Sequence, residues 1–322
     1  MILYWKSNPY AFMMFMSIMS AASANNLFSI WFFMELSTLS FLGVMISEIS
    51  QELSTLVKRD TLIIYFIIQT LPGLLILFLI LNPMNFWTKF FIVMLLMVKL
   101  GSAPFHQWMY SLSISMNWKI LWVMSTIQKF PPLFMLLISS SPCLIMFACI
   151  NMVVGTLLSM NCLNFKMIMA GSSLIQMGWV MLILNSHSNE ALIFFMLYTI
   201  LSGLIMYMLA EKHQEKFKIE TKNKMYSTML YISMLMLMSF PPTWMFFIKM
   251  SIMQDFTTIS PLFILFFFLI TSIFSYNYVK IFFASTTSQT PETIISIHTN
   301  EMNYMSILSL VIIIPLMVVY LI

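Results

Sequence analysis

The chain of 322 residues is too apolar for a water-soluble fold. Hydrophobic residues make up 61% of it and charged residues only 8%, whereas ordinary soluble domains contain about 25% charged residues. Disorder is excluded as well, because disordered chains combine low hydrophobicity with high net charge, and the net charge here is +4. The composition therefore predicts an all-α polytopic membrane protein.

Eleven segments are long and apolar enough to cross a bilayer, which takes about 20 mostly apolar residues. They cover approximately residues 9–24, 26–47, 61–81, 86–105, 119–139, 143–160, 166–185, 190–210, 226–249, 258–284 and 304–322. Only Asn25 and Asn26 separate the first two segments, so one long helix is an alternative there. The less apolar stretch 106–118 is expected at the membrane interface.

Basic residues in the loops gather on one side of the predicted membrane domain. The N-terminus and every second loop hold ten Lys or Arg residues, and the opposite side holds only Lys89. Because cytoplasmic or matrix loops carry an excess of Lys and Arg, the N-terminus is predicted on that side. With an odd number of spans, the C-terminus lies opposite. The ten residues are Lys6, Lys58, Arg59, Lys119, Lys166, Lys212, Lys216, Lys218, Lys222 and Lys224.

Four ionisable residues lie inside the apolar runs: Glu35, Lys99, Lys129 and Lys249. A lysine at mid-bilayer costs about 2.5–3.5 kcal/mol, so we expect these charges to be functional. The alternative, snorkelling to the interface, suits Lys280 better because it lies close to a loop. The three buried lysines have prolines nearby, which are Pro104, Pro131, Pro132, Pro241 and Pro242.

A broken helix beside a charge is a common build for an ion site in membranes, because proline frees a backbone carbonyl. Lys99 lies on the fourth span and Lys249 on the ninth. A repeat offset by five spans must be inverted, since five is odd. Burial disfavours the charged form of a lysine and a nearby carboxylate favours it. We therefore expect Glu35 and Lys99 to face each other, and their opening and closing to switch Lys99 between holding and releasing a proton.

No sequence motif points to a bound cofactor or metal. Cys143, Cys149 and Cys162 form no CxxC pair and have no His at ligand spacing, so we interpret them as buried small hydrophobic residues. The chain also lacks a glycine-rich nucleotide loop and a cysteine cluster of the kind that holds iron and sulfur.

Five motifs give the chain a family resemblance over nearly its whole length. They are WFFMELSTLS at 31–40, KLGSAPFHQW at 99–108, IQKFPP at 127–132, GSSLIQMGW at 171–179 and PPTWMFFIK at 241–249. On these residues the chain resembles the NADH–ubiquinone oxidoreductase chain 2 family, the antiporter-like subunit 2 of respiratory complex I, in its animal mitochondrial form. The resemblance implies an antiporter-like inverted repeat with two Pro-broken helices and about eleven helices.

The resemblance also implies a domain layout and a function. One transmembrane domain, 1–322, would comprise a first repeat at about 9–139, a second at about 143–284 and a C-terminal helix at 304–322. The chain would be a proton-translocating membrane-arm subunit, and so part of the enzyme NADH:ubiquinone reductase. Its partners would be other membrane-arm subunits and phospholipids, with no nucleic acid. NADH, FMN, Fe–S clusters and ubiquinone would lie in other subunits. It would be a multi-pass protein of the mitochondrial inner membrane, with its N-terminus on the matrix side and its C-terminus on the intermembrane-space side.

Carried over residue by residue, the family's intramembrane Glu and Lys residues correspond to Glu35, Lys99, Lys129 and Lys249. Where the family usually has a His, this chain has Gln176. Because Gln cannot carry a proton, a relay step there would need water. His106 lies in a family motif beside a helix break, where it makes a structural hydrogen bond or takes part in a relay.

Two other interpretations stay open. One is a free-standing cation/proton antiporter of the same fold, because fold alone does not decide function. The composition, with 35 Met and one Arg, favours a strongly biased genome such as that of an animal organelle, and so favours the complex I subunit. The other is a lipid-facing scaffold without an ion path, against which the buried charges argue.

Overall fold

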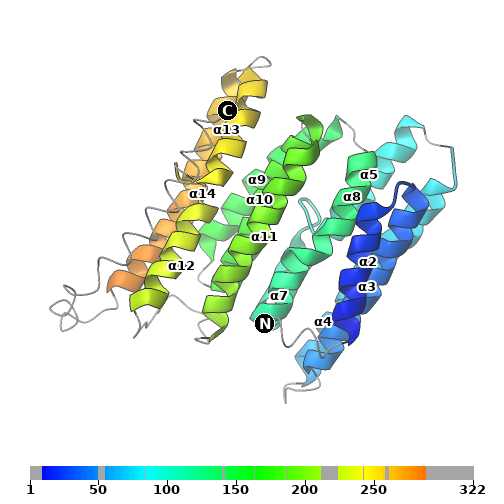
Figure 1. Cartoon of the computed structure of the whole chain (residues 1–322), viewed down its shortest axis with the longest axis horizontal. Coiled ribbons are helices and arrows are strands. Elements are labelled where there is room, and N and C mark those ends of the chain that lie inside the picture. Colours follow the sequence, from blue (N-terminus) through cyan, green and yellow to red (C-terminus); the bar gives the residue numbers. More distant parts are fainter. Residues whose placement is uncertain are drawn as a thin grey trace. The chain divides into compact units, whose positions relative to one another are not determined.

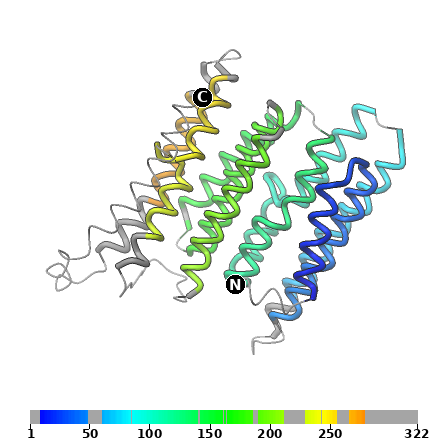
Figure 2. Tube along the Cα trace, viewed as in Figure 1, coloured from blue at the N-terminus to red at the C-terminus, as the bar shows by residue number. Residues whose placement is uncertain are grey.

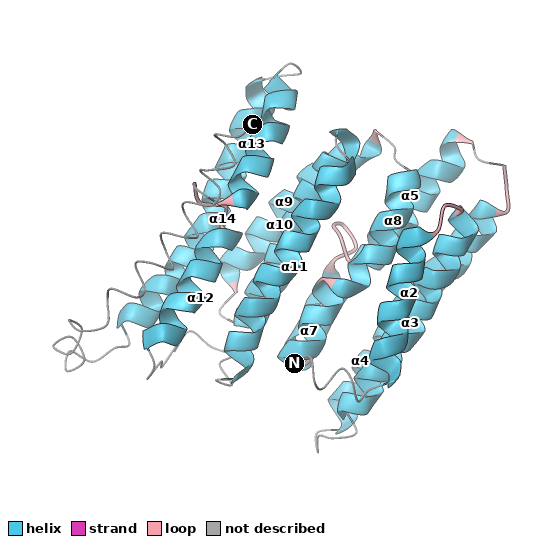
Figure 3. Ribbon diagram, in the orientation of Figure 1, coloured by secondary structure: helices cyan, strands magenta, loops and turns pink. Residues whose placement is uncertain are grey.

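The computed structural model describes residues 9–49, 55–83, 85–139, 142–162, 164–186, 188–211, 224–241, 243–257 and 261–287. Within these ranges the regular elements are helices joined by loops (Figure 3), which confirms the all-α prediction. They are α2 Pro9–Ser23, α3 Leu27–Ile49, α4 Thr55–Ile80, α5 Phe86–Leu100, α6 Gln107–Ser115, α7 Trp118–Ser125, the 3-10 turn η1 Ile127–Lys129, α8 Phe130–Ile138, α9 Cys143–Asn161, α10 Phe165–Ser186, α11 Ser188–Glu211, α12 Lys224–Leu237, α13 Trp244–Thr257 and α14 Pro261–Thr287.

Six stretches of the described residues are helical, long and apolar enough to span a membrane. They are Leu27–Glu48, Asp60–Ile80, Trp118–Ile138, Cys143–Met160, Phe165–Asn185 and Glu190–Ala210. Each overlaps one of the predicted spans, so the polytopic architecture is confirmed. The total of eleven stays a prediction, and the predicted C-terminal helix at 304–322 lies outside the described residues.

The chain divides into two compact units, Met1–Val154 and Gly155–Ile322, with the boundary inside α9. In the first unit α2 and α3 form a helical hairpin (Figures 1 and 2), and α3 also packs on α4 and α8. A short non-helical link at 24–26 separates α2 from α3, so two helices form here rather than the single long one. In the second unit α10 packs on α11, and α13 on α14. The predicted repeat boundaries stay predictions.

Apolar side chains face outward on these helices, as expected where lipid is the solvent. Phe12, Leu74 and Phe78 are among the large apolar residues that the fold leaves exposed. Polar side chains within the helices are satisfied locally instead: Ser17 Oγ donates to the Met14 carbonyl at 2.7 Å, as Ser37 Oγ does to Met34. This satisfies the requirement that polar groups inside a bilayer find partners within the protein.

Three of the predicted spans are interrupted. The span at 86–105 ends as a helix at Leu100, the span at 119–139 breaks at the turn η1, and the span at 226–249 breaks between Leu237 and Trp244. The stretch 106–118, for which sequence analysis assigned no helix, contains α6, and α6 packs on α4. Each interruption lies beside one of the buried lysines, and this is where the candidate site forms.

Candidate functional site

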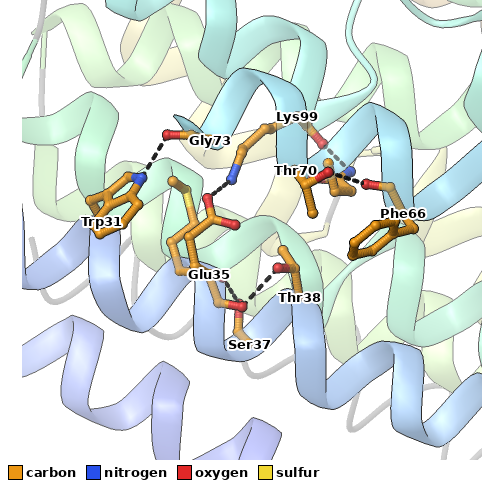
Figure 4. Close-up of polar contacts among 10 residues, drawn as sticks. Trp31, Glu35, Ser37, Thr38, Phe66, Thr70, Gly73 and Lys99 are labelled. Carbon is orange, nitrogen blue, oxygen red and sulfur yellow. Dashed lines mark hydrogen bonds and ion pairs between the residues drawn. The ribbon is translucent and has the colours of Figure 1, made fainter. Parts of the chain in front are cut away.

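Glu35 and Lys99 form an ion pair between α3 and α5 (Figure 4). The Lys99 amine donates a hydrogen bond to Glu35 Oε1. The Lys99 side chain is buried, whereas that of Glu35 is 19% exposed. A buried ion pair is retained only with good geometry, because desolvating both charges is costly. The expected facing of these two side chains is therefore confirmed, while their role in proton transfer stays a proposal.

Gly73 on α4 makes room for this ion pair. A Cβ atom at Gly73 would overlap the Glu35 carboxylate and lie 2.9 Å from Lys99 Nζ. The Gly73 carbonyl also accepts a hydrogen bond from Trp31 Nε1 at 2.7 Å, one turn before Glu35 on α3 (Figure 4). Only a residue without a side chain allows α4 to approach the two charges this closely.

The helix that carries Lys99 ends directly after it because of Gly101. Gly101 has φ 63°, in the left-handed region, and its N–H donates to the Val98 carbonyl at 3.1 Å. Glycine is favoured at such a helix end because it lacks a Cβ. Lys99 therefore lies in the last turn of α5, where the negative end of the helix dipole favours a basic residue.

The carbonyls freed by this break are accounted for individually. The Met97 carbonyl accepts the N–H and the Oγ of Ser102, both at 3.0 Å, and the Val98 carbonyl accepts Trp108 Nε1 at 3.1 Å. Gln69 Nε2 donates to the Lys99 carbonyl, also at 3.1 Å. Together with the Gly101 N–H, these donors satisfy carbonyls that a helix end would otherwise leave unpaired in a membrane interior.

Lys129 is the last residue of η1, at the junction between α7 and α8, and it is buried. Pro131 and Pro132 stand in the first turn of α8, where the missing N–H of a proline leaves no helical hydrogen bond unmade. Gln128 ties the junction to α3, because its Nε2 donates to the Ser37 carbonyl at 3.0 Å. The helix break at Lys129 is thus fastened to the helix that carries Glu35.

A small cavity in the first unit lies between Lys99 and Lys129. Its volume is about 10 Å³, and both Lys99 and Lys129 line it. Tyr65, Gln69 and Gln128 contribute further polar side chains to its wall. Glu35, Lys99 and Lys129, which sequence analysis identified separately, are therefore brought together around one ion pair and one cavity.

Lys249 lies in the second unit on α13 and is buried. Its Nζ donates to Ser239 Oγ at 2.6 Å and lies 4.9 Å from the centre of the Trp179 ring. Ser239 has φ 58° and follows the end of α12. The break between α12 and α13 therefore places the Ser239 hydroxyl next to Lys249. Aromatic rings attract cations through their negative faces. A cavity of about 300 Å³ is lined by Lys249, Ser239 and Trp179.

Gln176 and His106 both make backbone hydrogen bonds near helix breaks. Gln176 is fully buried on α10, and its Nε2 donates to the carbonyl of Leu237, the last residue of α12, at 3.3 Å. His106 Nδ1 lies 3.2 Å from the Pro104 carbonyl and donates to it. This contact fits the structural alternative for His106. A relay role for either residue stays a prediction.

Two of the three remaining prolines predicted at helix breaks lie in loops between helices. Pro104 lies in the loop between α5 and α6, and Pro241 in the loop between α12 and α13. Pro242 lies outside the described residues.

Among the residues that the structure describes, no three His, Cys, Asp or Glu side chains gather as metal ligands.

Sequence analysis missed several residues that shape the site. Gly73 was visible only as a Pro-Gly pair inside an apolar run, and Ser239 as a Ser shortly before a Pro-Pro pair. Gln69, Gln128 and Tyr65 gave a weak signal, as single polar groups in otherwise apolar segments. Their partners lie on other helices, so spacing along the chain could not reveal them.

Comparison with known proteins gives consistent results. The profile of the family described as NADH:quinone oxidoreductase/Mrp antiporter, transmembrane, matches residues 59–275. The NADH-ubiquinone oxidoreductase chain 2 of Artemia franciscana is 31% identical over 263 residues, covering 78% of this chain and 81% of that protein.

Solved structures share the fold at low sequence identity. A chain in the structure of respiratory complex I from Thermus thermophilus with bound aureothin has a TM-score of 0.73 at 18% identity, covering 85% of this chain and 69% of that one. A chain of the Mrp complex from Dietzia sp. DQ12-45-1b has a TM-score of 0.74 at 13% identity, covering 86% and 60%. The profile match and the Artemia relative show that the chain belongs to the NADH-ubiquinone oxidoreductase chain 2 family, within the wider NADH:quinone oxidoreductase/Mrp antiporter group.

Proposed function

We propose that this chain translocates protons as a membrane-arm subunit of respiratory complex I, coupled to electron transfer from NADH to ubiquinone. Family membership makes it a subunit of an enzyme, NADH:ubiquinone reductase. The observation that carries the proton-transfer proposal is the Glu35–Lys99 ion pair, which lies inside an apolar bundle directly at a helix break. The residues that carry protons in this proposal are Glu35, Lys99, Lys129 and Lys249.

The ion pair provides a switch. While the carboxylate touches the amine, Coulomb attraction holds the proton on Lys99, and at an effective dielectric constant near 20 this attraction is about 4 kcal/mol at a separation of 4 Å. When the pair separates, burial favours the neutral amine and the proton leaves. The long, flexible side chain of Lys99 can make this movement by rotation about its own bonds while α5 stays capped at Gly101.

The redox groups of the enzyme belong, in this proposal, to other subunits. NADH, FMN, Fe–S clusters and ubiquinone bind elsewhere, and this chain supplies only the proton path. Its partners are other membrane-arm subunits and phospholipids. The membrane is the mitochondrial inner membrane, with the N-terminus and the basic loop 211–225 in the matrix and Ile322 on the intermembrane side. The ten-to-one distribution of loop charges supports this orientation.

Protease access to the basic loop tests the orientation. Inside-out vesicles of the inner membrane should be cleaved within 211–225, and right-side-out mitoplasts should not. A second cleavage measurement at a matrix-facing subunit of known side controls for vesicle leakage. Cleavage of this loop in intact mitoplasts would overturn the orientation.

A free-standing cation/proton antiporter is the second candidate, favoured by the likeness of the fold to a chain of the Mrp complex. Solubilising the membranes in mild detergent separates the two. The complex I subunit should migrate on a native gel with an assembly that oxidises NADH, whereas the antiporter should migrate without that activity. Mass spectrometry of the band identifies the neighbouring chains.

A further inference from the structure

Two polar atoms point to a hydration site in the cavity between Lys99 and Lys129. Tyr65 Oη and Gln128 Oε1 are buried and have no hydrogen-bond partner among the described residues. Both residues line that cavity. Buried polar atoms in folded proteins nearly always have a partner, which is often an ordered water.

The two atoms are held in place by contacts that the rest of each polar group makes. The Tyr65 ring packs edge-on against Phe41 and Trp108, with ring centres 5.1 and 6.2 Å away. The Gln128 amide is oriented by its Nε2, which donates to the Ser37 carbonyl at 3.0 Å. A carbonyl only accepts, so the nitrogen of Gln128 must point at Ser37 and the oxygen must be the free end.

The size and charge of the cavity select its occupant. A volume of about 10 Å³ is near the lower limit for holding one water molecule. Two lysine side chains in the wall disfavour a metal cation, and the volume leaves little room for a larger anion. A water there can accept a hydrogen bond from Tyr65 and donate one to Gln128.

We propose that Tyr65 Oη and Gln128 Oε1 hold one water molecule that passes protons between Lys99 and Lys129. The Lys99 ammonium gives a proton to the water oxygen, and the water gives one of its own protons to the neutral Lys129 amine. The water is regenerated, and one proton has moved from Lys99 to Lys129. Tyr65 and Gln128 are positioning residues in this step, which deepens the proposed function and rests on it.

The first test is a structure of the intact complex at a resolution that shows buried waters. Density for an ordered water within hydrogen-bond distance of both Tyr65 Oη and Gln128 Oε1 supports the site. A cavity without density, in a map where other buried waters of the membrane arm are clear, overturns it.

The second test compares two variants with a matched control. Tyr65→Phe keeps the ring and its packing but removes the hydroxyl, which makes it the cleaner variant. Gln128→Leu removes the acceptor together with the Nε2 donor to the Ser37 carbonyl. Losing one net hydrogen bond predicts a roughly two- to tenfold fall in proton pumping per NADH oxidised, with a larger solvent isotope effect in D₂O. Tyr198→Phe removes another buried hydroxyl, in the second unit and not among the residues that line the cavity, and should leave both readouts unchanged.

The controls separate this inference from the function on which it rests. Native-gel band intensity shows whether each variant assembles, so pumping is compared per assembled complex. If Lys99→Ala abolishes pumping while Tyr65→Phe and Gln128→Leu pump normally, the water bridge is wrong and the proposed function stands. If Lys99→Ala itself pumps normally, the proposed function fails.

Discussion

Gly73→Ala perturbs the ion pair without touching either charged residue. The added Cβ would overlap the Glu35 carboxylate and lie 2.9 Å from Lys99 Nζ. The carboxylate must therefore rotate away from Lys99, or α4 must move outward. Inserting a methyl into a packed interior costs about 1–3 kcal/mol. A mid-range value of about 2 kcal/mol would make the closed pair about 30-fold less populated.

Proton pumping per NADH oxidised, measured in sealed vesicles, is the assay for this variant. We expect Gly73→Ala to assemble and to pump poorly, because the closed pair is a required state of the switch. Gly43→Ala is the matched control: it lies on α3 like Glu35, but its Cβ would press on the Tyr10 ring, 2.6 Å from Cγ, and its three nearest contacts are all atoms of that ring. That control should lower assembly at most, with a normal pumping ratio in the complex that forms.

A second substitution sharpens the test. Adding Glu35→Asp to Gly73→Ala shortens the carboxylate by one methylene and relieves the overlap, so part of the pumping should return. If Gly73→Ala pumps at the normal ratio, the close approach at Gly73 has no functional meaning and the reasoning from the Cβ overlap is refuted.

Three further predictions follow from the same contacts. Lys99→Ala should lose pumping, and Lys99→Arg should not restore it because Arg does not release its proton at accessible pH. Neutralising Lys99 and Glu35 together should restore assembly, seen on native gels, but not pumping. Full pumping in Lys99→Ala would contradict the proton-carrying role. Ser239→Ala and Ser239→Gly both remove the hydroxyl that accepts a hydrogen bond from Lys249 at 2.6 Å, so each should cost about 2 kcal/mol and slow proton pumping to the same extent. Ser275→Ala, in the wall of the same cavity, should leave pumping unchanged. A defect in Ser239→Ala alone would assign the effect to the backbone and not to the lost hydroxyl. Gln176 should have an ordered water nearby in a high-resolution map, and a dry site packed with Met and Phe would rule out a relay step at this residue.

The identity of the charged residues was predictable from sequence because a membrane makes charge conspicuous. Glu35, Lys99, Lys129 and Lys249 stand out in apolar runs where each costs free energy, and the same energetic argument predicts that Glu35 pairs with Lys99. Gly73 and Ser239 were not predictable. Their importance arises from a close approach between helices and from a left-handed backbone angle, and neither leaves a periodic trace in the sequence.

The helix boundaries were likewise predictable only in part from the sequence. Window-based hydropathy joined residues 226–249 into one span, yet the helix stops at Leu237 and restarts at Trp244. Apolar composition continues through the break because its side chains still face a bundle or lipid. The break itself depends on individual hydrogen bonds, such as the one from Gln176 Nε2 to the Leu237 carbonyl, and these come from another helix.

The breaks and the lysines depend on each other physically. A helix end inside a membrane leaves carbonyls that need donors, and at α5 these donors are Ser102, Trp108 and Gln69. In return, the helix end places the negative pole of α5 at Lys99 and leaves the following backbone outside a helical ladder. A lysine in mid-helix would lack this favourable pole. The hydrogen bonds that cap the break are therefore as necessary to the proposed switch as the charges themselves.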